Sequence, residues 1–254
     1  MSSKESNLVG LDVTTGVIVS NVKAPFVSGP FIGLGQQVDF DQHTGHVIAG
    51  GRLTQDGPHV VGRLDPKTGD FVKVAELDSR LLPVLPGPSV FDTISRQEIV
   101  MFGNKTESTI SLYAINVDTG DISTIAEDPE KGRELSTLAY DDKTQLVYGL
   151  GMKRVSSTEF ERTLVELDPR QQIWRTVGVI EGYEVASGGE TTIDEAARAL
   201  LWIGQKSGAN QTDPFHLISV DISSAKVTAA PILCNKDAEC PWSIDSWHRP
   251  SYLH

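Results

Sequence analysis

One carboxylate stands out among the residues whose type and position suit chemistry. Glu190 directly precedes the predicted inner strand at residues 191–193 and follows Gly188 and Gly189, whose lack of side chains lets a ligand or metal approach the backbone. In a partly desolvated site the pKa of such a carboxyl rises, which suits general acid or base catalysis. With Glu184 it is also the predicted ligand pair for a divalent cation such as Ca²⁺, which takes oxygen ligands.

Aromatic and polar side chains near the same position in the chain's repeats complete a predicted ligand-binding set. Aromatic faces stack on sugars and other flat ligands, and the candidates are Trp242, Tyr183 and Phe160. The polar members of the set are Arg52, Lys153 and Gln37. The alternative to a catalytic or metal-binding role is that Glu190 forms an ion pair with Arg52, Arg133 or Lys153.

The remaining reactive residue types form no complete catalytic set. Ser89 and Ser136 are candidate nucleophiles, but no base can be assigned to either. The six histidines show no zinc-binding spacing, and His59 and His216, which each start a predicted third strand, are expected at the periphery. No phosphate-binding loop, dinucleotide fingerprint or Gly-x-Ser-x-Gly motif is present. Whether the protein is an enzyme therefore stays open.

Two recurring patterns indicate which elements position these side chains. The first is an apolar stretch ending in Asp, a polar turn and a second apolar run, with the Asp residues 49 to 53 residues apart at Asp41, Asp92, Asp141, Asp194 and Asp245. The second is an apolar run that ends in Asp or Asn before another turn. It recurs at intervals of 51 to 53 residues, at Asp12, Asp65, Asn116, Asp168 and Asp221. Four strand-like runs in each unit of this length predict the blades of a β-propeller. The repeated Asp is expected to cap its own turn.

The fold prediction is an all-β, five-bladed β-propeller with four-stranded antiparallel blades in a single domain, residues 1–254. The blades are expected at about residues 35–77, 88–126, 136–180 and 190–233, and the fifth at 242–254 plus 8–22. In that fifth blade the N-terminal outer strands, residues 8–22, pair with C-terminal inner strands, residues 243–254. Such pairing closes the ring and removes an open sheet edge.

The turns between the third and fourth strands of each unit differ along the chain. Gly16, Gly69 and Gly120 stand where a hairpin needs a positive φ, which glycine adopts without steric cost. The third and fourth units carry residues 170–172 and 223–225 there and no glycine. A different type of turn is therefore expected in those two units.

The segments LDVTTG, LDPKTG and NVDTGD carry a resemblance to a known group of repeats. Over residues 8–254 the chain resembles the YVTN and quinoprotein-like propeller repeats. That resemblance implies the propeller fold, but the group includes lectins, lactonases, dehydrogenases and protein-binding scaffolds, so it implies no single activity. A quinone cofactor is not implied, because quinoprotein dehydrogenases have larger rings.

The site is expected where propellers usually bind ligands, at the end of the channel where the blade-to-blade loops and the second-to-third-strand loops gather. Residues 126–137 and 181–191 make that end acidic on one side. The predicted function is a propeller that binds a small molecule, glycan or protein at one asymmetric site there. The alternative is a metal-assisted hydrolase, lactonase or isomerase that uses a carboxylate at the same mouth.

Charge and hydropathy limit the partners and the location. With 22 basic and 34 acidic residues the net charge is −12, which disfavours nucleic acid and anionic membranes. No long apolar run or secretory signal is present, so a cytoplasmic location is predicted. The alternative is a secreted protein whose leader was removed, in which Cys234 and Cys240 pair and Asn104 and Asn210 are glycosylated.

Overall fold

A computed structural model describes twelve segments of the chain, residues 4–11, 18–28, 38–54, 57–78, 81–83, 89–104, 109–125, 128–130, 133–156, 159–185, 191–209 and 213–232. The regular structure in these segments is β-strand throughout, as the period-two apolar runs predict. None of these residues belongs to a helix that is long and apolar enough to cross a membrane.

Four antiparallel sheets of four strands form the blades. Blade one contains β3 (Val38–Asp41), β4 (His46–Arg52), β5 (His59–Leu64) and β6 (Phe71–Glu76). Blade two contains β8 (Ser89–Asp92), β9 (Gln97–Asn104), β10 (Thr109–Asn116) and β11 (Ile122–Thr124). Blade three contains β12 (Arg133–Asp141), β13 (Leu146–Arg154), β14 (Phe160–Asp168) and β15 (Ile173–Val179). Blade four contains β17 (Thr191–Asp194), β18 (Ala199–Lys206), β19 (His216–Asp221) and β20 (Val227–Pro231).

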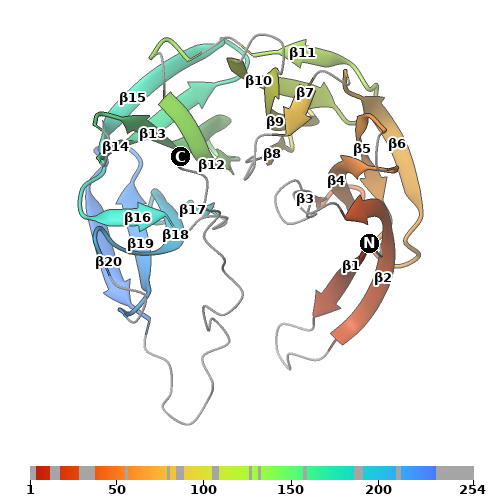
Figure 1. Cartoon of the computed structure of the whole chain (residues 1–254), viewed down its shortest axis with the longest axis horizontal. Coiled ribbons are helices and arrows are strands. Elements are labelled where there is room, and N and C mark those ends of the chain that lie inside the picture. The colour runs from red at the N-terminus through yellow and green to blue at the C-terminus, as the bar shows by residue number, and fades with distance from the viewer. Residues whose placement is uncertain are drawn as a thin grey trace.

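Two short strands extend blades two and four at one end. β7 (Leu81–Pro83) pairs with the end of β9, and β16 (Tyr183–Val185) pairs with the end of β18. The first residues of β12 pair in the same way with the end of β13. The sheets follow one another around an arc, with the first strands β3, β8, β12 and β17 toward its centre (Figure 1).

The prediction of five blades is wrong: the described propeller has four four-stranded blades. The N-terminal segment instead forms a two-stranded antiparallel hairpin of β1 (Lys4–Leu11) and β2 (Ile18–Ser28). Its strands satisfy each other's backbone hydrogen bonds, and Ala24 and Phe26 of β2 pack onto blade one. The expected partner strands, residues 243–254, lie outside the described segments.

In blades one to three, both faces of the middle strands are buried against a neighbouring sheet, whereas in blade four Leu217 of β19 is exposed on the face away from blade three. On β9, for example, Ile99 and Met101 face blade three, whereas Val100 and Phe102 face blade one. Because side chains alternate along a strand, each middle strand of blades one to three contributes to two separate apolar cores. One core lies between the hairpin and blade one, and the others lie between blades one and two, two and three, and three and four.

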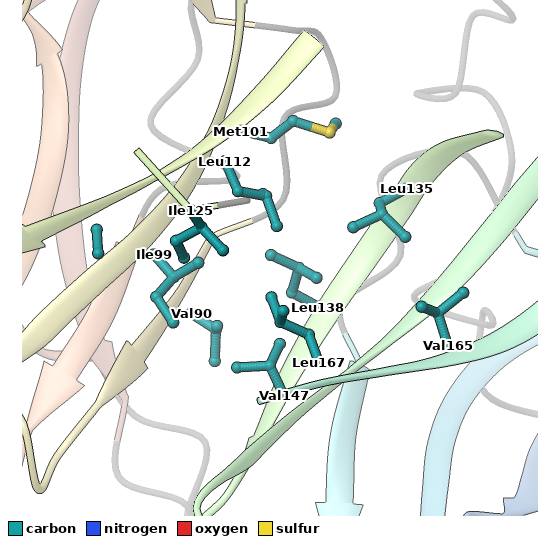
Figure 2. Close-up of a cluster of buried hydrophobic side chains, with 11 residues drawn as sticks. Val90, Ile99, Met101, Leu112, Ile125, Leu135, Leu138, Val147, Val165 and Leu167 are labelled. Atoms are coloured by element: carbon teal, nitrogen blue, oxygen red, sulfur yellow. The ribbon is translucent and has the colours of Figure 1, made fainter. Parts of the chain in front are cut away.

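The core between blades two and three illustrates this packing. Side chains of β8, β9 and β10 point toward those of β12, β13 and β14 (Figure 2). Ile99 is fully buried there, and Val147 and Val165 are almost as inaccessible. Burying an aliphatic side chain of this size contributes about 1.5–3 kcal/mol, so each blade is stabilised chiefly by contact with its neighbours.

The repeated Asp of the first pattern caps the turn between the first two strands of each blade, as expected. Asp41, Asp92, Asp141 and Asp194 each accept a backbone N–H from the turn that follows, over 2.9–3.2 Å. The first three also accept the hydroxyl of the residue three positions later, Thr44, Ser95 or Thr144.

Two of these carboxylates also join neighbouring blades. Asp41 Oδ2 lies 2.8 Å from Arg96 Nη1 of blade two, and Asp141 Oδ2 lies 2.7 Å from Arg198 Nη1 of blade four. Burial opposes ionisation of Asp141, but the hydrogen bonds from Thr144 and Arg198 outweigh it and hold the pKa of its carboxyl below the usual value. The turn cap therefore also serves as an ion-pair partner for the next blade.

The expectation of a different third-to-fourth-strand turn in blades three and four is wrong. Gln172 (φ 58°) and Ala225 (φ 56°) occupy the same left-handed position as Gly69 (φ 80°) and Gly120 (φ 81°). In each of these turns, a backbone N–H two or three residues on donates to the side chain of Asp65, Asn116, Asp168 or Asp221. This cap holds the turn even where a non-glycine residue strains the backbone.

Replacing Gln172 by glycine is expected to stabilise the protein. Gln172 is exposed, so relief of the left-handed strain outweighs the added chain entropy of glycine by about 0.5–1 kcal/mol. Chemical denaturation measures the gain. Gln171→Gly, at the preceding residue with a negative φ, is the control; equal stabilisation by both variants would contradict the account.

Asp141→Ala is expected to lower the free energy of unfolding by about 2–4 kcal/mol, because it removes the turn cap and leaves Arg198 without its partner. Its exposed neighbour Asp142, which accepts the hydroxyl of Thr93 of blade two and caps no turn in the described contacts, provides the control variant Asp142→Ala. Urea denaturation of both variants tests this, and a loss no larger than that of the control would count against the interblade role.

Candidate functional site

The predicted site residues that the structure describes lie at one end of the blades. We call this the loop-rich end; it is where the second strand of each blade ends and the third begins. Arg52 ends β4, Lys153 lies one residue before the end of β13, and Phe160 begins β14. Tyr183 begins β16 and pairs with Lys206 at the end of β18. Lys153, Phe160 and Tyr183 thus belong to neighbouring blades, whereas Arg52 belongs to blade one.

The other predicted residues are described only in part or not at all. Gln37, Glu190 and Trp242 lie outside the described segments, and for Glu184 only the backbone pairing with Gln205 is described. Cys234, Cys240 and Asn210 also lie outside them, and Asn104 is the last residue of β9. Within the described part of the chain, no three His, Cys, Asp or Glu side chains are grouped so as to hold a metal ion.

The acidic loop before blade three contains its own cations. Arg133, whose side chain is 2% exposed, binds both carboxylate oxygens of Asp128 at 2.7 Å. Glu130 accepts from Arg133 at 2.8 Å and from Lys153 at 3.1 Å, and the hydrogen bond from Lys153 lowers the pKa of its carboxyl. Arg133 and Lys153 are therefore engaged within blade three, in a fixed polar network at the loop-rich end.

The aromatic candidates on this end are half-buried. Tyr183 packs against the core between blades three and four and meets His216 edge-on, with ring centroids 5.8 Å apart. Phe160 pairs across the hairpin with Arg154. The Tyr183 ring is thus held by its blade, and both aromatic residues stay partly accessible, which suits a contact surface.

Neither candidate serine is adjacent to a histidine base in the described contacts. The Ser136 hydroxyl donates to the carbonyl of Leu150 over 3.1 Å. The Ser89 hydroxyl donates to Asp39 Oδ2 over 3.2 Å, across the contact between blades one and two. Ser89 therefore contacts a carboxyl group that is not among the predicted site residues.

That carboxyl belongs to a pair of acids, half-buried Asp39 of β3 and buried Glu98 of β9. Glu98 is 2% exposed and hydrogen-bonds to Asp39 and Ser89. Burial, and then the charge of Asp39, raise the pKa of the Glu98 carboxyl well above its usual range. Carboxyl groups with perturbed pKa values concentrate at functional sites. The pair is therefore a second candidate site, separate from the loop-rich end.

A signal for this pair was present in the repeat. Glu98 stands six residues after the repeated Asp, where the other blades have Val47, Val147 and Leu200. Asp39 stands two residues before it, where the others have Val90, Ala139 and Thr192. Aligning the units position by position would have identified both as departures from an otherwise mostly apolar pattern.

His59 and His216, expected at the periphery, are buried. His59 is 3% exposed, lies edge-on to Phe102 of blade two at 5.0 Å, and neither of its ring nitrogens has a hydrogen-bond partner in the described residues. Burial, with a smaller effect of the Arg52 charge, lowers the pKa of His59 to about 4. The imidazole thus packs as a neutral ring between the blades.

Comparison with known proteins supports the fold. Neither protein-family models nor curated proteins match the sequence. Among solved structures, TolB from Acinetobacter baumannii is similar, with 12% identity and a TM-score of 0.56, over 88% of this chain and 48% of the TolB chain. The chain therefore spans about half the length of TolB.

Two further structures align with weaker scores. An oligogalacturonate lyase from Vibrio parahaemolyticus has 11% identity and a TM-score of 0.48, over 90% of this chain and 73% of that chain. Dipeptidyl peptidase 4 from Porphyromonas gingivalis has 9% identity and a TM-score of 0.43, over 88% and 36% respectively. The comparisons confirm a likeness to β-propeller proteins, but they do not support the YVTN and quinoprotein-like group in particular.

His59 is expected to make the fold sensitive to acid. Because its folded pKa of about 4 lies below the ordinary 6.5, its contribution is present above pH 6.5 and is lost as the pH falls toward 4, by up to about 3 kcal/mol. His59→Phe keeps a ring against Phe102 and should flatten this part of the stability profile. Denaturation at several pH values measures it, with exposed His43→Gln as control; an unchanged profile in His59→Phe would refute the assignment.

Proposed function

We propose that the protein is a binding propeller with one asymmetric site at the loop-rich end of blades three and four. Lys153, Phe160 and Tyr183 are the residues we assign to the contact surface. The ligand we infer is a small molecule, glycan or protein segment that presents polar groups beside a flat or apolar face. Such ligands suit a surface of fixed aromatic rings and oriented charged groups.

The difference between the two ends of the blades carries this proposal. At the turn end the same Asp cap recurs in all four blades. At the loop-rich end the paired positions differ, with Leu81 opposite Asn104, Arg133 opposite Lys153, and Tyr183 opposite Lys206. Repeats that share their scaffold residues and differ at one end provide the unlike groups that a single asymmetric site needs.

Rigidity of the blade-three corner supports the same surface. Arg133 is fixed by Asp128, Glu130 and the hydroxyl of Thr176, which ties the loop before blade three to β15. Lys153 remains 39% exposed while it contacts Glu130. A partly exposed cation on a rigid support loses little conformational entropy on binding.

A thermal-shift panel of sugars, organic acids, nucleotides and short peptides tests the proposal, because a ligand of the folded state raises its melting temperature. For a ligand that stabilises the wild type, Lys153→Ala, Phe160→Ala and Tyr183→Ala are each expected to weaken binding about tenfold or more. Lys143→Ala, an exposed lysine at the opposite end of blade three, is the matched control and should bind normally. Binding lost in the control but kept in all three site variants would overturn the proposal.

The same panel separates the metal-assisted alternative. Ca²⁺, Mn²⁺ and a chelator are included, and stabilisation by a cation that is lost in Glu190→Gln would support the hydrolase, lactonase or isomerase reading in place of a purely binding site.

A further inference from the structure

The contact between blades one and two departs from the packing rule of the other contacts. Between blades two and three, Val90 and Val147 belong to one apolar core, and between blades three and four Ala139 and Leu200 do. The same repeat positions between blades one and two hold Asp39 and Glu98. Two apolar groups that face each other elsewhere are thus replaced by two carboxyl groups.

Glu98 is the enclosed and incompletely hydrogen-bonded member of the pair, and Asp39 is half-buried. Glu98 is fully inside the contact between the blades, and its Oε2 has no hydrogen-bond partner among the described residues. Ser89 of β8 donates to Asp39 Oδ2 over 3.2 Å, and Glu98 hydrogen-bonds to both of these residues. β3, which carries Asp39, packs against β8 of the next blade, and β8 pairs with the start of β9, which carries Glu98.

Hydrogen bonding between two carboxyl groups requires a proton on one of them, because an ionised carboxylate only accepts. Because Glu98 is buried beside Asp39, ionisation of both carboxyl groups carries a large cost. An unpaired buried oxygen adds to that cost when it is charged.

The other ionisable groups of this contact lie toward its two ends. At the turn end, Arg96 pairs with Asp41 and Asp118, and Arg63 lies 3.6 Å from Asp118. At the loop-rich end, His59 is buried beside Arg52, and Tyr113 of β10 packs against the apolar core. The side chains that influence the Glu98 carboxyl are instead Asp39, through its charge and a hydrogen bond, and Ser89, through a hydrogen bond.

We propose that Asp39 and Glu98 form a proton-binding site that retains one proton at neutral pH, and that loss of this proton loosens the contact between blades one and two. Glu98 holds the proton, and Asp39 accepts its hydrogen bond. Because the folded pKa of Glu98 is raised, the stabilisation is complete below the unfolded value of about 4.5 and is lost as the pH rises through the folded value. This pH dependence of stability is opposite to that of His59, whose contribution is lost as the pH falls.

Denaturation of the full chain between about pH 5 and pH 9 tests the proposal. Wild type is expected to become less stable as the pH rises. Glu98→Gln, which resembles the protonated acid, should lose that decline and melt at a higher temperature than wild type at the alkaline end. Glu159→Gln, at an exposed glutamate, is the matched control and should follow wild type. A Glu98→Gln profile parallel to that of wild type would overturn the proposal.

A second measurement does not depend on any variant folding. In wild-type protein with ¹³C-labelled glutamate, the side-chain carboxyl carbon of Glu98 should keep its protonated chemical shift at pH 7, when exposed glutamates have ionised. A carboxylate shift at pH 7 would refute the site. So would stabilisation of the wild type by Ca²⁺ or Mg²⁺ at alkaline pH that is absent in Glu98→Gln, because the pair would then hold a cation and not a proton.

Discussion

Burial of each blade by its neighbours is the constraint on which the structure depends. A four-stranded sheet of this size exposes two apolar faces and cannot bury either alone. Alternation along β9 sends Ile99 toward blade three and Val100 toward blade one, and both are inaccessible to solvent. The same alternation on β14 sends Leu164 toward blade four and Val165 toward blade two. Each strand therefore stabilises two contacts at once.

The division of the blades into two unlike ends follows from this packing. At the turn end, Asp caps and the ion pairs of Arg96 and Arg198 hold consecutive blades at a fixed spacing. Once that end fixes the scaffold, the loop-rich end is free to differ from blade to blade. At the carboxyl pair between blades one and two the scaffold itself departs from its apolar rule, and Glu98 of that pair is buried.

Sequence periodicity was sufficient for the parts of the fold that are local. The strands expected in blade one, residues 37–40, 47–50, 60–64 and 71–75, match β3 to β6 within two residues, and the repeated Asp caps its turn as expected. The number of blades was not local information, because it depended on whether the N-terminal strands pair with the far end of the chain or with each other. The turn type in blades three and four was predicted wrongly, because a side-chain cap can hold a left-handed turn at Gln172 and Ala225 without glycine.

The candidate site was predictable only in part, for a related reason. The loop-rich end followed from the order of the strands, so Lys153, Phe160 and Tyr183 could be placed together on neighbouring blades. The Asp39–Glu98 pair and the buried His59 depend on which faces of adjacent blades meet, which period alone does not specify. A comparison of equivalent positions among the repeats would have revealed each acid, but not that the two meet across the contact between the blades.

Native-state hydrogen exchange of a Leu164→Ala variant tests the central claim most directly. Leu164 is fully buried on β14, in the core between blades three and four. If neighbours stabilise each other, amide exchange should accelerate together in β13–β14 and in β18–β19, while β4–β5 of blade one stays protected. Acceleration confined to blade three would contradict the account, because it would mean that the blades are stable independently.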